Sequence, residues 1–347
     1  MTSALVSALR AQQVGCAHLG SQFYAGLLDH VGADVEASGV CAEAMRGPWR
    51  GDLLDLAVPL RFLGALNRLV LDGTEPALAA LWPPQATTVS PSIDAVLVRV
   101  VGDHQARITA EMVAVVQTNE VGRSAALAGG FLTIARRTGL PLRLLEVGTS
   151  AGLNLRWDQY HYSDRGTTWG DITSPLHLDG PYDGAPTPLT GTAVVSERHG
   201  CDVHPLDVTD AHDRLWLRSF VWPDQPERLR RLDAAIAVAA RVPVTMTAAS
   251  ASGWVPGVLA DPAEGVATVV FHSIVWQYLP DDVRSALGSA MGDAGRRATE
   301  HAPLAWLRYE PTSVFTGHAS LDLQMWPSGE RRVLAHAGFH GAPVTWL

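Results

Sequence analysis

The chain has 347 residues, enough for one large domain or two ordinary ones. Its formal net charge is −9, and because nucleic-acid affinity rests on basic contacts with phosphate, we expect no nucleic-acid partner. All 26 basic residues are arginines. This excludes lysine Schiff-base chemistry, a phosphate-loop lysine and a kinase lysine.

Cys16, Cys41 and Cys201 form a sparse, odd set without CxxC spacing, as is typical of free thiols in a reducing cytoplasm. The opening residues MTSALVSALRAQQ lack the basic region and apolar core of a signal peptide. No apolar run approaches the ~20 residues of a membrane span. We therefore expect a cytoplasmic protein without a membrane partner; the sequence does not indicate its oligomeric state.

Residues 1–115 are expected to form a helical N-terminal region. Within 92–116 the apolar residues recur mostly at spacings of three and four, which predicts one amphipathic helix. The stretch 50–73 has a similar pattern, with Pro59 as a kink or break. The segment LWPPQATTVSPS between them reads as a loop.

The segment QTNEVGR, residues 117–123, has two interpretations. In the first, Thr118 or Asn119 caps the helix that follows, and Glu120 favours its positive end. In the second, the segment lies over a ligand pocket, because four polar side chains of different type exceed what a cap needs. That interpretation makes Glu120 a titratable catalytic candidate and assigns substrate binding to Gln117, Asn119 and Arg123.

From residue 140 onward, short apolar runs alternate with helical stretches, notably 210–240 and 280–297. Five runs are predicted as buried parallel strands: 142–147, 192–200, 242–249, 267–273 and 303–310. Segments 320–326 and 331–338 are predicted as a C-terminal β-hairpin. The pattern predicts an α/β fold, a doubly wound and mainly parallel sheet over 116–347, with an insertion at about 163–191.

The segment LRLLEVGTSAGLNL, residues 142–155, fits two motifs. As Glu-x-Gly-x-x-x-Gly after a strand, it resembles a loop that binds S-adenosylmethionine; as Gly-x-Ser-x-Gly, it resembles the nucleophile elbow of a serine hydrolase with Ser150. An elbow normally follows several strands, yet the preceding 140 residues are mostly helical, and no HGGG-type oxyanion segment appears. A nucleotide loop belongs after the first strand, which is where this segment lies.

The nucleotide interpretation supplies a set of cofactor contacts. Glycines let the backbone approach a ligand, and the helix after the loop is expected to offer free N–H groups. An acid at the end of the second strand should take the ribose hydroxyls, and Asp202 is the candidate. The expected cofactor-binding residues are Glu146, Gly148, Thr149, Ser150, Gly152, Asn154, Asp202, Ser250 and His272.

Two positions depart from the usual cofactor pattern. Ser150 replaces the middle glycine of E-x-G-x-G-x-G, and the third strand ends in Ala248, Ala249 and Ser250 where an acid often contacts adenine. The fourth strand should end near the reacting centre. Its end, VVFHSIVWQYLP, makes His272 a catalytic candidate beside Glu310 and makes Tyr278 a substrate-binding candidate.

The segment DVHPLDVTDAHD, residues 202–213, holds histidines and acids that could ligate a metal. Capping of the following helix by Asp210 or Thr209 explains it more simply. His336 and His340 lie four residues apart, but Gly338 separates them and no HExxH glutamate accompanies them. We therefore predict no metal site.

Five segments together resemble a bacterial family of uncharacterised proteins, domain of unknown function 2332. They are VQTNEVGRSAAL, LLEVGTSAGLNL, HPLDVTD, VWPDQPERL and VVFHSIVWQYLP. The resemblance implies a Rossmann domain like that of class I S-adenosylmethionine-dependent methyltransferases, behind a helical N-terminal region. It implies no particular reaction.

The sequence thus predicts an S-adenosylmethionine-dependent methyltransferase that acts on a small molecule. Two alternatives stay open. One is a non-catalytic protein that keeps the fold and binds S-adenosylmethionine or another nucleotide. The other is the serine hydrolase with Ser150 as nucleophile.

Overall fold

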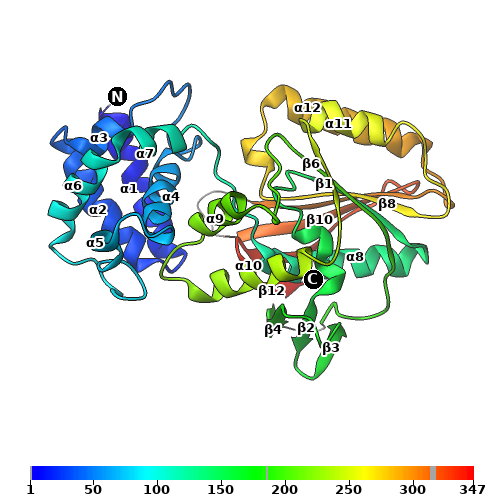
Figure 1. The fold of residues 1–347 in the computed structure, drawn as a ribbon. Coiled ribbons are helices and arrows are strands. Elements are labelled where there is room, and N and C mark those ends of the chain that lie inside the picture. Colours follow the sequence, from blue (N-terminus) through cyan, green and yellow to red (C-terminus); the bar gives the residue numbers. More distant parts are fainter. Residues whose placement is uncertain (1, 185–186, 313–317) are drawn as a thin grey trace. The chain divides into compact units, whose positions relative to one another are not determined.

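The structure, a computed structural model, describes residues 2–184, 187–312 and 318–347 (Figure 1). Residues 185 and 186 of the predicted insertion therefore lie outside the described residues. The chain divides into two compact units. The helical unit comprises residues 1–118 and 210–229, and the sheet unit comprises 119–209 and 230–347. Residues 210–229 thus belong to the helical unit and not, as predicted, to the C-terminal region.

The described residues of the helical unit form helices joined by loops. Those helices are α1 (Thr2–His18), α2 (Gln22–Glu36), α3 (Val40–Ala44), α4 (Val58–Leu71), α5 (Pro76–Ala79), α6 (Ile93–Asp103), α7 (Gln105–Glu111) and α9 (Ala211–Ser219). The prediction of a single helix over 92–116 is wrong, because the structure has two helices there, α6 and α7. The chain leaves helical geometry at His104, which has ψ +16° and places its Nε2 atom 2.7 Å from Glu75 Oε1.

Segment 210–229 is held to the helical unit by specific polar contacts. Asp224 accepts hydrogen bonds from the Ser21 hydroxyl (2.6 Å) and from the Phe23 N–H (2.9 Å), so it caps the start of α2. The guanidinium of Arg68 lies 3.5 Å from the centre of the Trp216 ring. Such contacts across long sequence separations leave no local pattern, so the sequence analysis could not place this segment.

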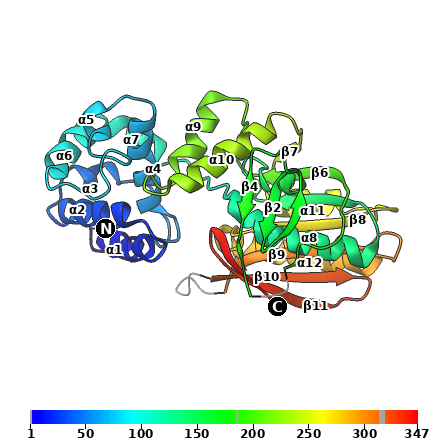
Figure 2. The same cartoon turned by 90° about the horizontal axis from the view of Figure 1, so that it is seen from below.

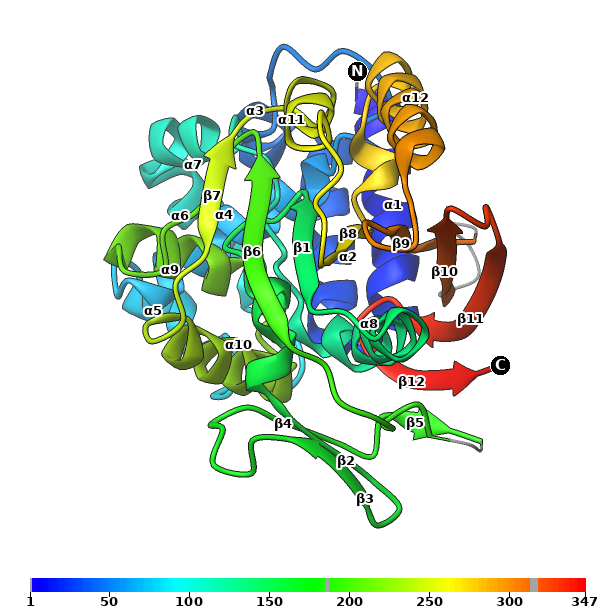
Figure 3. The same ribbon diagram turned by 90° about the vertical axis from the view of Figure 1, so that its right-hand side faces the viewer.

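The sheet unit is built on a nine-stranded sheet with the order β5-β12-β11-β10-β9-β8-β1-β6-β7 (Figure 3). Its strands are β1 (Leu142–Val147), β5 (Tyr182–Asp183), β6 (Val195–Asp202), β7 (Thr245–Ala248), β8 (Ala267–Ser273), β9 (Leu304–Pro311), β10 (His318–Trp326), β11 (Arg331–Gly338) and β12 (Gly341–Trp346). The strands from β7 to β9 in this order run parallel. From β9 to β12 the neighbours are antiparallel, and Figure 2 shows β10 beside β11.

Helices cover both faces of the parallel strands, as Figure 1 shows. Along β8, Phe271 packs edge-on against Phe131 of α8 (Ser124–Thr138), whereas Val270 packs in a core with residues of α11 (Ala251–Val258) and α12 (Asp281–Arg297). Successive side chains of a strand point to opposite faces, which is why β1 and β8 are almost wholly buried. The remaining helices are α10 (Pro226–Ala239), η1 (Val121–Arg123), η2 (Asn154–Gln159) and η3 (Trp276–Tyr278).

The predicted insertion contains strands that the sequence analysis did not expect. A small sheet with the order β3-β2-β4 is formed by β2 (His161–Asp164), β3 (Thr167–Gly170) and β4 (His177–Asp179), and β5 pairs with β12 at the edge of the main sheet. Strand β12 was not predicted either, and it contains Gly341 and Pro343, residue types that are depleted in strands. Among the described residues, no helix is both long and apolar enough to cross a membrane.

Candidate functional site

The loop after β1, residues 148–153, is called the β1 loop here. Its backbone turns sharply through left-handed conformations at Gly148 (φ +69°), Ser150 (φ +54°) and Gly152 (φ +67°). A side chain in this region costs about 1–2 kcal/mol, so glycine suits two of the three positions and Ser150 carries strain.

The backbone N–H groups of the β1 loop are all engaged within the protein. Their acceptors are the Cys201 carbonyl for Gly148 and Thr149, Asp202 Oδ2 for Ser150, Asn119 Oδ1 for Ala151 and Leu153, and the Thr149 carbonyl for Gly152. The loop therefore presents no spare backbone donor to an anion in this conformation.

The helix expected after the β1 loop is replaced by η2, a six-residue 3-10 helix with non-helical geometry at Arg156. The Arg156 Nη1 atom donates to the carbonyls of Ala151 (3.2 Å) and Gly152 (2.8 Å), so the turn is closed by a side chain. The prediction of an α-helix directly after this loop is therefore wrong.

Asp202 lies at the end of β6, beside the β1 loop. Its Oδ2 atom accepts the Ser150 N–H and its Oδ1 atom accepts the His204 N–H, each at 2.9 Å. The side chain is half-buried. A carboxylate oxygen can accept two hydrogen bonds, so each oxygen keeps acceptor capacity for a ligand. Ser250, at the end of β7, instead caps α11 by accepting the Gly253 N–H at 3.2 Å.

Glu146 lies beneath the β1 loop and is almost completely buried. Burial raises the pKa of its carboxyl to about 8, against a smaller opposing effect of the Thr149 hydroxyl, which lies 2.7 Å from Oε2. Nearby Asp202 raises the pKa further. Glu146 is therefore protonated at neutral pH, and it supports the loop from inside the fold.

Two asparagines connect residues 119–124 with the β1 loop and with η2. Asn119 accepts from the loop, and Asn154 Oδ1 accepts the Ser124 hydroxyl at 2.7 Å. The Asn154 Nδ2 group donates to the Glu120 carbonyl at 3.4 Å. The residue that caps η1 is Glu120, whose Oε1 accepts the Gly122 N–H at 3.0 Å, rather than Thr118 or Asn119. Gln117 is buried at the end of the helical unit's first segment.

The segment Ser273–Tyr278, called the β8 segment here, covers the start of the β1 loop. A Cβ atom added to Gly148 would lie 2.4 Å from Val275 Cγ2, so Val275 fills the space in front of that glycine. Ile274 has φ +53°, which is a true outlier for a β-branched residue. Strain of this kind persists where surrounding contacts fix it, and it is frequent at functional sites.

Beneath the β8 segment, His272 and Glu310 form a close pair. His272 Nδ1 lies 2.5 Å from Glu310 Oε1, and the same carboxylate accepts the Val275 and Trp276 N–H groups at 3.2 Å each. The His272 ring is wholly buried and stacks on Trp276 with ring centres 5.5 Å apart. Its Nε2 atom is buried and has no hydrogen-bond partner within the described residues.

Arg123 fastens the β8 segment from one side. Its Nη1 donates to the Ser273 carbonyl (2.8 Å) and its Nε donates to the Phe339 carbonyl (3.0 Å). Burial lowers the pKa of its guanidinium, while Glu120 is the first of the nearby groups that raise it; Glu310 and Tyr278 are also among them. The structure thus gathers several predicted site residues around the β8 segment: Glu120, Arg123, His272, Tyr278 and Glu310.

The hydrolase interpretation depends on Ser150. Its positive φ resembles that of an elbow, but its Oγ atom is buried and has no hydrogen-bond partner within the described residues. Within the described residues no histidine therefore forms a hydrogen bond with Ser150 Oγ, as an activating base would. The Ala151 N–H that would stabilise an oxyanion already donates to Asn119. This geometry disfavours a nucleophilic Ser150.

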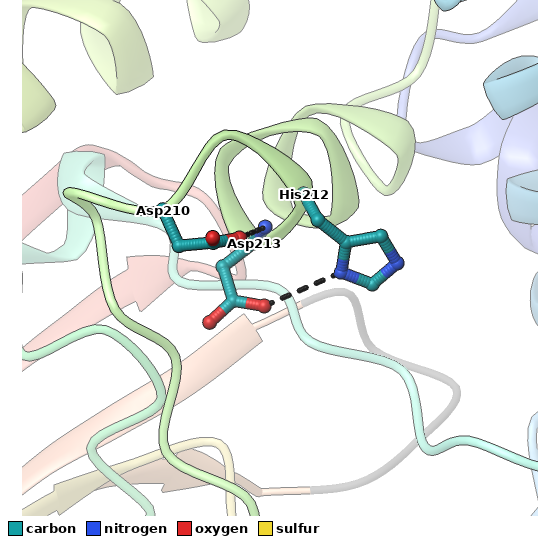
Figure 4. A group of neighbouring side chains, drawn as sticks. All are labelled: Asp210, His212 and Asp213. Carbon is teal, nitrogen blue, oxygen red and sulfur yellow. Dashed lines mark hydrogen bonds and ion pairs between the residues drawn. The ribbon is translucent and has the colours of Figure 1, made fainter.

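Within the described residues, Asp210, His212 and Asp213 could hold a metal, since their ligand atoms lie within 4.8 Å of one another. Figure 4 shows them on the first turn of α9. Asp210 caps the helix by accepting the Asp213 N–H at 3.0 Å, and two of the three residues are exposed. Such exposed acids are common at helix starts, so this group remains best explained as a cap.

The model of a bacterial protein family matches residues 6–346, nearly the whole chain. The chain belongs to this family. It is described as "Uncharacterized protein conserved in bacteria (DUF2332)", and the five segments that suggested it lie inside the match. No curated protein matches the chain.

Proposed function

We propose that this member of the family is an S-adenosylmethionine-dependent methyltransferase with a Rossmann fold of the class I type, acting on a small molecule. The main support is the order β7-β6-β1-β8-β9 of five parallel strands, with a glycine-containing loop after the central β1 and Asp202 at the end of β6. Open α/β sheets bind ligands at the carboxyl ends of such strands.

The residues at this edge fit part of the cofactor. Asp202 keeps acceptor capacity on both oxygens, which suits two ribose hydroxyls. Gly148 lacks a side chain where a ligand would approach, although Val275 fills that space now. The β1 loop has no spare N–H for the carboxylate of the methionine part, so that group would have to be held elsewhere.

When bound, S-adenosylmethionine supplies a methyl group activated by a sulfonium. The protein's share of such a reaction is to align the acceptor and exclude water. The β8 segment is suited to the second task, because it lies over Gly148 and His272. Predicted acceptor contacts within the sheet unit come from Tyr278, which is 53% exposed, and from Asn119 and Arg123, although two guanidinium nitrogens of Arg123 are already occupied.

Calorimetry of the purified protein with S-adenosylmethionine and S-adenosylhomocysteine tests the proposal. We expect both to bind, and we expect Asp202→Asn to weaken binding at least tenfold, because an amide offers one acceptor oxygen instead of two. Asp207→Asn is the matched control. That carboxylate also accepts a nearby backbone N–H, from Thr209 at 2.8 Å, but lies five residues beyond Asp202.

Absence of binding by the wild-type protein would overturn the proposal, and equal losses in the two variants would remove Asp202 from the site. Binding without methylation of any acceptor offered would favour a non-catalytic ligand-binding protein. The three outcomes are distinct because binding and turnover are measured separately.

A further inference from the structure

His272 Nε2 is a buried polar atom that the fold leaves without a partner. It belongs to a wholly buried ring at the carboxyl end of β8. A buried acceptor without a hydrogen bond costs about 1–3 kcal/mol, so a position that keeps one invites a functional explanation.

The contacts of Glu310 define the protonation of this ring. Its oxygens accept two backbone N–H groups, as an ionised carboxylate does. An ionised carboxylate can only accept hydrogen bonds, so in its contact with His272 the proton lies on Nδ1. In a neutral imidazole with the proton on Nδ1, Nε2 holds the free lone pair. The pair therefore presents a base whose orientation and tautomer are set by a carboxylate.

We propose that the His272–Glu310 pair accepts a proton from a hydroxyl-bearing methyl acceptor, an inference that rests on the proposed function. The O–H bond of the acceptor breaks and its proton goes to Nε2, while the acceptor oxygen gains the methyl group. The bond between that methyl group and the sulfonium sulfur of S-adenosylmethionine breaks at the same time, and neutral S-adenosylhomocysteine leaves. The imidazolium formed is then paired with the Glu310 carboxylate. A general base is needed because a hydroxyl keeps its proton at neutral pH.

The surroundings of His272 favour a hydroxyl over an ammonium group as the acceptor. The ring contacts the indole rings of Trp276, at 5.5 Å, and Trp306, at 6.0 Å. Moving a neutral hydroxyl into such a site costs much less than moving a charged ammonium group. The negative charge of Glu310 is also already engaged by three N–H groups.

A purely structural role is the competing explanation. Glu310 could serve only to fasten the β8 segment, with His272 as a third donor to it. That role explains Nδ1 but leaves Nε2 buried and unsatisfied. It also predicts that Nε2 stays inaccessible, whereas a base must be reached by its substrate. In our account Trp276 swings away, and the strained backbone at Ile274 is the point that moves.

Nitrogen-15 NMR of histidine-labelled protein tests the tautomer. We expect His272 to carry its proton on Nδ1 and none on Nε2. In Glu310→Gln the side-chain amide can donate to Nδ1, so the proton should move to Nε2. A proton on Nε2 in the wild-type protein would overturn the proposal.

Diethyl pyrocarbonate, which acylates unprotonated imidazole nitrogens, tests access. We expect slow modification of His272 in the wild-type protein, at least tenfold faster modification in Trp276→Ala, and slower modification in Glu310→Gln. Trp169→Ala is the matched control. Trp169 also stacks on an aromatic ring, that of Trp157 at 4.9 Å, but it belongs to the insertion. If His272 resists the reagent in the wild-type protein and in Trp276→Ala, the structural explanation is correct.

The acceptor class is tested with small probes in the same NMR experiment. With S-adenosylhomocysteine present, phenol should shift the His272 Nε2 signal and benzylamine should not. A shift with benzylamine alone, or with neither probe, would overturn the assignment of a hydroxyl acceptor. Failure of the proposed function would instead appear as absence of cofactor binding by calorimetry, with the His272 tautomer and its reactivity unchanged.

Discussion

The two segments that meet at the carboxyl edge of the sheet differ in what they leave unsatisfied. In the β1 loop every backbone N–H from residue 148 to 153 is bonded within the protein. Under the β8 segment, by contrast, the Nε2 atom of His272 has no partner within the described residues, and Ile274 holds a strained backbone above it.

This difference suggests separate roles for the two segments. The β1 loop offers a ligand no backbone hydrogen-bond donor. What it offers is the surface of its backbone and the carboxylate of Asp202 beside it. The β8 segment covers His272, the base proposed above, and contains the strained backbone at Ile274. In the proposed function, the glycine-containing β1 loop marks the location of the ligand site, and residues elsewhere supply the chemistry.

The largest expected effect is on the pH dependence of stability and comes from Glu146. This effect shows whether the β1 loop keeps water away from the buried carboxyl. Its pKa is about 8 in the folded protein and 4.5 in its ordinary state, so between these values the folded protein holds a proton that the unfolded chain releases. The free energy of unfolding should fall by up to about 1.4 kcal/mol per pH unit in this window. Urea titrations at several pH values should show this decline in the wild-type protein and a smaller one in Glu146→Gln. Parallel curves would mean that water reaches Glu146.

A side chain at Gly148 should break the contact between the two segments. Gly148→Val combines a positive φ with a collision against Val275, so we expect a loss of about 3 kcal/mol, measured as a lower urea midpoint. Adding Val275→Ala should recover part of it, whereas Val333→Ala, on β11, should recover none. Unchanged stability in Gly148→Val would contradict the packing described here.

Loss of Arg123 should loosen the β8 segment alone. Arg123→Ala leaves the carbonyls of Ser273 and Phe339 without donors, which should cost about 2 kcal/mol. Hydrogen exchange should speed up at the Val275 and Trp276 amides and stay unchanged at Ser150 and Ala151. Equal acceleration in both segments would show that they move together.

The smallest expected effect is at Ser150. Ser150→Gly relieves a positive φ and removes a buried hydroxyl without a partner, while it raises the entropy of the unfolded chain. The net result should be a gain of about 1 kcal/mol by thermal unfolding. A clear loss would indicate that the Ser150 hydroxyl makes a contact important for the fold.

The sequence predicted the parts of the fold that local patterns encode. Apolar runs located the five parallel strands, and the glycine spacing located the turn after the first of them. Contacts between distant residues were beyond its reach. No local pattern indicates that Arg156 closes the turn after the β1 loop or that Val275 covers Gly148. His272 and Glu310 were each candidates, but their pairing depends on the register of β8 with β9.

The most direct test of the central claim is the affinity of Val275→Ala for S-adenosylhomocysteine. If the ligand lies against Gly148, the wild-type protein must first displace Val275, and removing that side chain should strengthen binding by roughly threefold to tenfold. Val333→Ala, which shortens a valine on β11, should bind as the wild-type protein does. Calorimetry that finds tighter binding in Val275→Ala alone supports the account. Equal affinity in all three proteins, or no binding in any, would contradict it.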